Sequence, residues 1–182
     1  HRSVDLVDSC STTSRHLAEP LAGSAPEASR WLLLEQPGPW GRDALTMSHL
    51  DPSVGQQLKD WATAHAIRIG LIRRPGQHAD GQSRLPRRTV LIADCEPSAP
   101  RLVSADLADP RDLLGADPAS LMVVGSPVLR QHGVQPSRVL AVCTNGKRDR
   151  CCALRGRQVV ATLDADLPGQ VWETSHLGGH RF

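Results

Sequence analysis

Apolar residues along the chain fall into short strand-like runs and one long helix-like stretch. Short apolar runs bounded by glycine and proline are typical of buried strands. Helical spacing of Val54, Leu58, Trp61 and Ala62 predicts a helix over 51–66, with a proline in its first turn. Further helices are predicted within the opening segment 9–28 and over 152–167. The predicted strands are 31–36, 67–74, 88–95, 138–144 and 170–176.

Strands that alternate with helices favour an α/β architecture. The run 120–126 fits either a strand or part of a helix, and the pattern does not decide between them. Two segments resemble each other: WLLLEQPGPWGRDAL (31–45) and VLAVCTNGKRDRCCAL (139–154) both lead from an apolar strand through a glycine-containing loop to Arg-Asp and Ala-Leu. This similarity indicates two related α/β units in tandem, with chance similarity as the alternative.

The amino-acid composition indicates which residues form the core and which kinds of partner are not expected. The 182 residues include four Trp, one Phe and no Tyr, so the core must consist of Leu, Val, Ile and Ala. The net charge of +2 does not imply nucleic acid. Basic residues cluster in 73–88 and 146–157, but no aromatic platform for stacked bases accompanies them. No apolar run approaches the roughly 18 residues that cross a bilayer, so no membrane association is expected.

The ends of the chain and its cysteine content bear on localisation. Residues 1–10 lack the basic-then-apolar pattern of a signal peptide. Five cysteines is an odd number, and the chain is longer than disulfide-dependent secreted scaffolds. We therefore expect a cytoplasmic protein with metal-binding or catalytic thiols. The missing initial Met and the abrupt end suggest a trimmed piece of a longer product.

Three of the five cysteines fall within ten residues. Cys143 ends an apolar strand, and Cys151 and Cys152 stand where the next helix begins. Such exposed ends can present a metal ligand or a nucleophile, whereas cysteine elsewhere is usually a buried, inert residue. We interpret Cys10 and Cys95 in that second way, as ordinary core residues.

His176 and His180 form an H-x-x-x-H pattern at the end of the chain. Gly178 and Gly179 lie between them, and each glycine costs a helix about 1 kcal/mol, so a turn is predicted instead. Glycines there let backbone N–H groups approach an acceptor such as a metal-bound thiolate or a bridging sulfide. Two thiolates with two imidazoles suit zinc or iron–sulfur chemistry.

The cysteine spacing favours one of these metals. Structural zinc sites commonly use a tight C-x₂₋₄-C pair. Here the spacing is C-x₇-C or C-x₈-C, depending on whether Cys151 or Cys152 is used. The wide loop favours a [2Fe–2S] cluster, and a structural zinc module stays an alternative. A dithiol oxidoreductase would pair Cys143 with Cys152, or Cys151 with Cys152, although C-x-x-C is missing. A partner-binding protein that has lost its metal is a further alternative.

The segments CTNGKRDRCCALRG (143–156) and VWETSHLGGHRF (171–182) resemble the sucrase/ferredoxin-like family, and WLLLEQPGPWGRDAL resembles its opening. The resemblance implies a C-terminal thioredoxin-like ferredoxin domain. It also implies a C-x₈-C motif with an Arg-Asp pair, then H-x-G-G-H, as ligands of a [2Fe–2S] cluster. Carried onto this chain, the ligands are Cys143, Cys152, His176 and His180.

Two departures from the family pattern stand out. Ala153 follows the second cysteine where the family often has Gly, and Cys151 lies beside that cysteine and could substitute for it. The family also continues beyond the last residue of this chain. The resemblance therefore implies an N-terminal α/β domain over 1–134, and over 135–182 the start of a truncated thioredoxin-like domain.

The implied function is one-electron transfer without catalysis. Neutral imidazoles in place of two thiolates should raise the potential from roughly −400 mV towards the −150 to +300 mV of Rieske centres. A ligand imidazole can also gain or lose a proton, which predicts a pH-dependent potential with a slope near about 59 mV per pH unit. The expected partners are an unknown reductase and acceptor. No sucrase activity is expected, because no glycosidase carboxylate pair stands out. The oligomeric state stays open.

Overall fold

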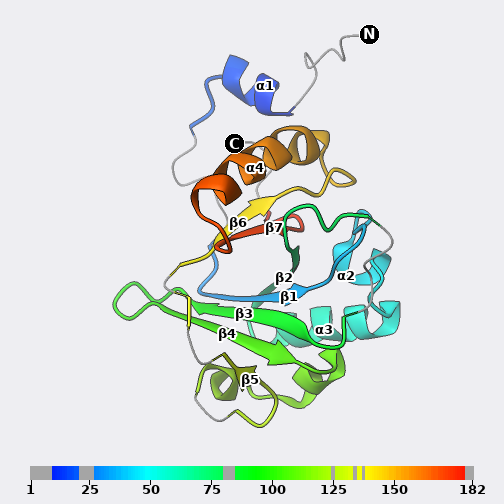
Figure 1. The fold of residues 1–182 in the computed structure, drawn as a ribbon, viewed down its shortest axis with the longest axis vertical. Coiled ribbons are helices and arrows are strands. Elements are labelled where there is room, and N and C mark those ends of the chain that lie inside the picture. The colour runs from blue at the N-terminus through cyan, green and yellow to red at the C-terminus, as the bar shows by residue number, and fades with distance from the viewer. Residues whose placement is uncertain are drawn as a thin grey trace.

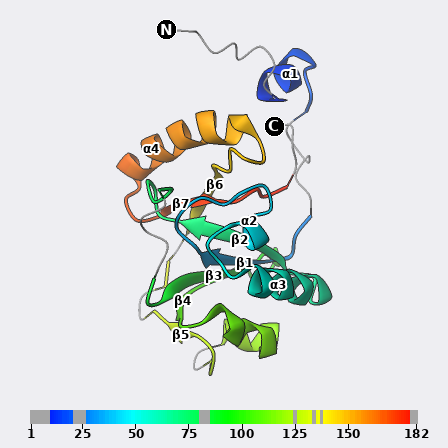
Figure 2. The same cartoon turned by 90° about the vertical axis from the view of Figure 1, so that its right-hand side faces the viewer.

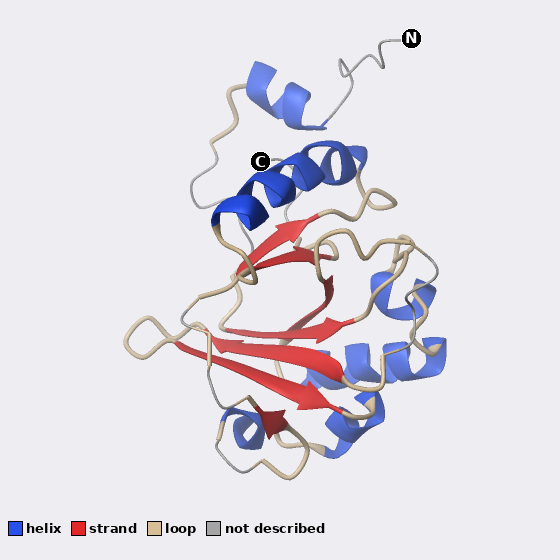
Figure 3. Cartoon of the chain, in the orientation of Figure 1, coloured by secondary structure: helices blue, strands red, loops and turns tan. Residues whose placement is uncertain are grey.

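Seven strands meet edge to edge in one mixed sheet (Figure 1). The computed structural model describes residues 10–20, 27–79, 85–123, 126–132, 135–136 and 138–178. The strand order is β5-β4-β3-β1-β2-β7-β6. The strands are β1 Arg30–Glu35, β2 Arg68–Arg73, β3 Arg88–Asp94, β4 Arg101–Leu107, β5 Arg130–Gln131, β6 Leu140–Cys143 and β7 Val171–Thr174. The α-helices are α1 Cys10–His16, α2 Ala44–Met47, α3 Pro52–Ala64 and α4 Arg157–Asp166 (Figure 3).

The sheet contains two strand–helix–strand units. In the first, β1 leads through α2 and α3 to β2, which lies parallel to β1. In the second, β6 leads through α4 to β7, which lies parallel to β6. Each unit keeps its helix close to its own strands, with α3 beside β2 and α4 beside β7 (Figure 2). The units meet where β2 pairs antiparallel with β7, and β3 pairs antiparallel with the other edge of β1.

This topology decides one of the four predictions about fold and domains. The α/β class is confirmed, because one mixed seven-strand sheet is combined with several helices. The thioredoxin-like classification, the tandem relation and the boundary at 134/135 stay predictions.

The main core lies between the sheet and α3, and local sequence explains the helix. The Asp51 carboxylate accepts a hydrogen bond from the Ser53 N–H at 2.9 Å, and Pro52 occupies the first turn, so the helix begins at a capped and pre-organised position. The apolar face that the spacing predicted packs against the sheet residues Leu32, Leu34 and Leu71. Its buried residues are Val54, Gly55, Leu58, Trp61 and Ala62.

A second, smaller apolar cluster lies on alternate strand positions. It comprises Leu33, Ile72, Leu91 and Trp172. Because successive strand side chains point to opposite faces, Leu33 belongs to this cluster while Leu32 and Leu34 belong to the main core. An apolar groove of about 730 Å³ adjoins the cluster, with Val139 in its lining.

Most predicted elements are confirmed, and the structure differs from the prediction at several places. The strand β4 was not predicted, because the run RLVSADL is interrupted by Ser104 and Asp106. The undecided run 120–126 overlaps a 3₁₀ helix, Pro118–Met122. The helix predicted over 152–167 begins with a π-helical turn, Cys152–Gly156, before α4. The short helix α2 was also missed, because four residues carry too little periodic signal.

The prediction that Cys95 is a core residue was wrong. Its side chain is exposed, because it directly follows the last residue of β3, where the chain turns away from the sheet. The side chain of Cys10 lies outside the described residues. Within the described ranges, every helix is too short or too polar to cross a lipid bilayer.

The close contact between α2 and α3 predicts that a Gly-to-Ala substitution in α3 destabilises the protein, which is opposite to the usual effect of this substitution in a helix. In an exposed helix, replacing Gly by Ala stabilises by about 1 kcal/mol. At Gly55, however, a Cβ atom would clash with the backbone carbonyl oxygen of Leu45. We expect Gly55→Ala to lower the free energy of unfolding by about 1–3 kcal/mol, as overpacking does, in urea denaturation.

Gly115 offers a matched control for this substitution. An added Cβ atom there would meet no described atom within 4 Å. Gly115→Ala should therefore stay within about 0.5 kcal/mol of the wild type. Equal stability of Gly55→Ala and the wild type would contradict a tight contact between Gly55 and Leu45.

Candidate metal centre

The parallel pairing of β6 with β7 brings the cysteine and histidine motifs together. Cys143 is the last residue of β6 and lies in register with Thr174, the last residue of β7. His176 follows two residues later. Because parallel strands end at the same edge of a sheet, the two motifs converge there although about thirty residues separate them. The loop after Cys143 then returns Cys152 to the same edge, at the start of the π-helical turn.

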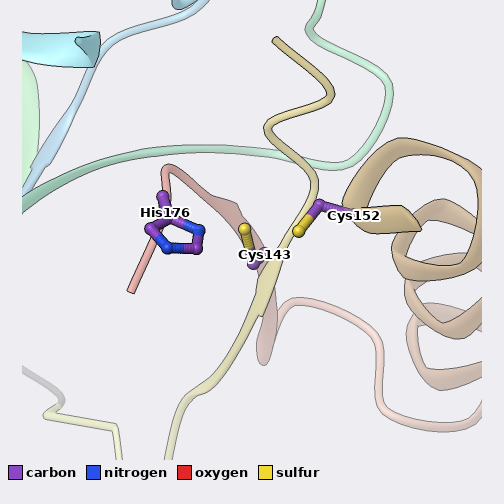
Figure 4. A group of neighbouring side chains, drawn as sticks. All are labelled: Cys143, Cys152 and His176. Atoms are coloured by element: carbon purple, nitrogen blue, oxygen red, sulfur yellow. The ribbon is translucent and has the colours of Figure 1, made fainter. Parts of the chain in front are cut away.

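Three of the four predicted ligand residues form a compact group (Figure 4). The Sγ atoms of Cys143 and Cys152 and a ring nitrogen of His176 all lie within 4.8 Å of one another, and the three residues are half-buried. In Figure 4 the imidazole and the Cys152 sulfur lie on either side of the Cys143 sulfur. Two sulfur donors and one nitrogen donor fit zinc or an iron–sulfur cluster. His180 lies outside the described residues, so its role stays a prediction.

The choice between the adjacent cysteines follows from how the helix begins. The Asp149 carboxylate accepts a hydrogen bond from the Cys151 N–H at 2.8 Å, and the Asp149 carbonyl accepts one from the Cys152 N–H at 3.1 Å. Asp149 therefore caps this turn and orients both cysteines. Cys152 belongs to the compact group with Cys143 and His176, and Cys151 does not. Within the Arg-Asp motif, the aspartate therefore has a structural role.

The environment of Cys143 favours a thiolate. A hydrogen bond from Cys152 lowers the pKa of the Cys143 thiol to about 7, against the opposing effect of burial. The backbone N–H groups of Asn145 and Leu177 lower this pKa further. Because metals bind the thiolate, a lowered pKa makes metal binding easier at neutral pH. One of these two donors, Leu177, directly precedes Gly178, where the sequence predicted a glycine-containing turn.

Close backbone packing holds the loop and the helix together. A Cβ atom on Gly156 would clash with the carbonyl oxygen of Cys143, so only glycine lets the π-helical turn come this close to β6. A Cβ atom on Gly146 would lie 2.6 Å from the Cβ of Ala153. Ala153, at a position where the family often has Gly, is therefore accommodated because residue 146 lacks a side chain.

A buried ion pair that the sequence pattern did not reveal supports the edge of the sheet where β6 and β7 end. The Arg73 guanidinium donates two hydrogen bonds to Glu173 Oε2, at 2.8 and 2.6 Å, and both side chains are only 3 % exposed. The Thr144 hydroxyl donates to the same oxygen at 2.8 Å, directly after Cys143. Arg73 also donates to the Gly38 carbonyl at 2.7 Å.

The ion pair controls the protonation of both partners. Burial alone would raise the pKa of Glu173, but the charge of Arg73 and hydrogen bonds from Thr144, Arg73 and the Gly76 N–H hold it below its ordinary value. Burial lowers the pKa of Arg73, and the charge and hydrogen bond of Glu173 counteract that effect. Both groups therefore stay charged at neutral pH. The only signal in the sequence was a charged residue inside each of two apolar strands, IRIGLIRR and QVWETSH.

Comparison with known proteins identifies the family. Residues 21–182 match the family model described as sucrase/ferredoxin-like. The chain belongs to this family, because the match covers most of its length. No curated protein and no solved structure matched the chain.

The buried pair generates a double-mutant prediction. Arg73→Met leaves the Glu173 carboxylate buried without its counter-charge, which typically costs about 3–5 kcal/mol. Adding Glu173→Leu removes that charge, so the double variant should lose less stability than the sum of the single variants. The free energies of unfolding in urea give this coupling energy.

A matched control is the exposed pair Arg111 and Asp51, 2.9 Å apart with 57 % and 49 % exposure. Its coupling energy should not exceed about 1 kcal/mol. Additive losses at Arg73 and Glu173 would show that the two charges do not depend on each other.

Proposed function

We propose that this member of the sucrase/ferredoxin-like family is a one-electron carrier with a [2Fe–2S] cluster held by Cys143, Cys152, His176 and His180. The observation that carries the proposal is the group of two sulfurs and one imidazole nitrogen within 4.8 Å of one another, at the edge where β6 and β7 end. His180 is the fourth ligand by its motif, four residues after His176.

The spacing of the two cysteines supports a [2Fe–2S] cluster over a single zinc ion. The two cysteines are separated by a wide loop, C-x₈-C, where structural zinc sites commonly use a tight pair. A [2Fe–2S] cluster supplies a site that accepts and returns one electron, and histidines can replace cysteines on one of its irons. Its added negative charge is favoured by the N–H groups of Asn145 and Leu177, which point to the Cys143 sulfur.

The surface beside the centre suits an acidic redox partner. Lys147 and Arg150 are exposed on the loop between the two ligand cysteines. Exposed cations next to a redox centre speed the encounter with a partner of opposite charge and make it sensitive to salt. We therefore propose acidic proteins as the electron donor and acceptor. The pH dependence of the potential stays a prediction from the imidazole ligands.

A dithiol oxidoreductase is the second candidate, and one observation favours it. The Cys152 thiol hydrogen-bonds to Cys143, and the pKa of Cys143 is lowered to about 7, as in reactive dithiols. Formation of a disulfide would remove two electrons and two protons from this pair, and a disulfide substrate would accept them. This candidate requires no metal, so metal analysis separates it from the carrier.

Metal content of the freshly purified protein tests the proposal. We expect a red-brown solution with about two irons and two acid-labile sulfides per chain. Cys152→Ser should remove most of the iron, because its sulfur belongs to the group of ligand atoms. Cys151→Ser should retain the iron, and Cys95→Ser, at an exposed cysteine outside that group, is the matched control.

Each of the other outcomes supports one of the alternative functions. A colourless chain with one zinc points to the structural module. A chain without metal that forms a Cys143–Cys152 disulfide points to the dithiol enzyme. A chain with neither property that tolerates His176→Ala points to a partner-binding protein.

The charge of the ligand set generates a prediction for the potential. His176→Cys replaces a neutral imidazole by a thiolate, which adds one negative charge and makes reduction harder. We expect the midpoint potential to shift towards the roughly −400 mV of four-cysteine ferredoxins, in a spectroelectrochemical titration at fixed pH. His78→Cys, at an exposed position in another loop, should leave the potential unchanged. An iron-loaded His176→Cys protein with an unchanged potential would contradict ligation by His176.

A further inference from the structure

A pocket of about 250 Å³, lined by both polar and apolar residues, lies next to the edge where β6 and β7 end. One wall comes from the loop before α2 and from α3, and the other from the loop after β6 and the segment after β7. These walls belong to the two different strand–helix–strand units. The polar lining residues besides His176 are Arg42, Asp43, Lys59, Asn145, Arg148 and Ser175.

Asn145 offers an unused hydrogen-bond donor to this pocket. The residue is only 4 % exposed, and its Nδ2 atom is buried without a hydrogen-bond partner among the described residues. An amide N–H group without an acceptor is costly to bury, and native proteins rarely contain one. Because Asn145 lines the pocket, an acceptor there would satisfy the donor.

The charges of the lining residues indicate that this acceptor carries a negative charge. Lys59 Nζ lies 2.7 Å from Asp43 Oδ2, so these two charges offset each other. Arg42 and Arg148 have no carboxylate partner in the part of the chain that the structure describes, which leaves a surplus of two positive charges. Two guanidinium groups with parallel N–H donors match the oxygens of carboxylates and phosphates.

Ser175 adds another donor to the same pocket. Its Oγ accepts a hydrogen bond from the Leu71 N–H at 3.0 Å, which leaves the hydroxyl proton to donate. Asn145, Ser175, Arg42 and Arg148 together offer neutral and charged donors around one small volume. We infer that this pocket binds a small dianion with oxygen acceptors, such as a phosphate group or a dicarboxylate. The concave shape and the small volume favour a free small molecule as the ligand.

The position of the pocket couples this ligand to the metal centre. His176 lines the pocket and also belongs to the Cys143–Cys152 group. A dianion beside His176 disfavours an added electron, so it binds the oxidised protein more tightly and lowers the midpoint potential. This coupling rests on the proposed electron-carrier function, whereas binding of the anion does not.

Calorimetric titration of the purified full chain tests the binding. The probes are sodium phosphate and sodium succinate, with acetate as the monoanion control and ionic strength held constant with sodium chloride. We expect saturable binding of at least one dianion, and about 10-fold or weaker affinity in Arg42→Gln and Arg148→Gln, since each loses charged hydrogen bonds. Asn145→Ser should also weaken binding, and Arg130→Gln, an exposed arginine on β5, is the matched control.

The outcomes separate binding from coupling. Tighter binding of phosphate assigns the site to phosphoryl ligands, and tighter binding of succinate assigns it to dicarboxylates. No saturable binding of either probe, or equal affinity in Arg148→Gln and the wild type, overturns the anion site. A second titration follows the midpoint potential with and without the bound dianion. A potential that does not move, although the anion binds an iron-loaded protein, overturns the coupling alone.

Discussion

The arrangement of this protein depends on the buried ion pair between Arg73 and Glu173. The strands β2 and β7 pair at only two register positions, Ile72 with Thr174 and Arg73 with Glu173, and this short seam joins the two parallel strand pairs. Removing both charges from water is costly, and only complete hydrogen bonding offsets that cost. The Arg73 guanidinium additionally lies 3.9 Å from the ring centre of Trp40, so a residue of the first unit encloses the pair from another side.

The same interaction fixes the edge of the sheet that carries Cys143. Glu173 Oε2 accepts hydrogen bonds from Arg73 and from the Thr144 hydroxyl, and Thr144 directly follows Cys143. The position of Cys143 is therefore set by a residue of β2, far earlier in the chain. Such a polar network restricts the sheet to one register, since a shift by one residue would leave a buried charge without its partner.

The sequence predicted those elements that depend on interactions within one short segment of the chain. The helix α3 was predicted closely because Asp51, Pro52 and its apolar spacing all act within one segment. The grouping of Cys143, Cys152 and His176 could be expected from the sequence, because each of them lies at or near the end of a recognisable element. The pair Arg73–Glu173 was not found, since its partners are 100 residues apart and depend on strand order. The strand β4 was missed for a similar reason: Ser104 interrupts its apolar run yet is buried, and its N–H donates to the distant Gln135 side chain at 2.6 Å.

The two similar segments 31–45 and 139–154 share more than their pattern. Arg42 and Asp43 come from the Arg-Asp pair of the first segment, and Arg148 comes from that of the second. All three line the same pocket, on opposite sides of the junction between the units. In the second segment, Asp149 caps the helix that carries Cys152, whereas in the first segment Asp43 binds Lys59 of α3. The aspartates thus serve different local structures, while the arginines converge. Arg42 and Arg148 bring two exposed positive charges to one pocket, and this pocket joins the first unit of the chain to the edge of the second unit that carries His176.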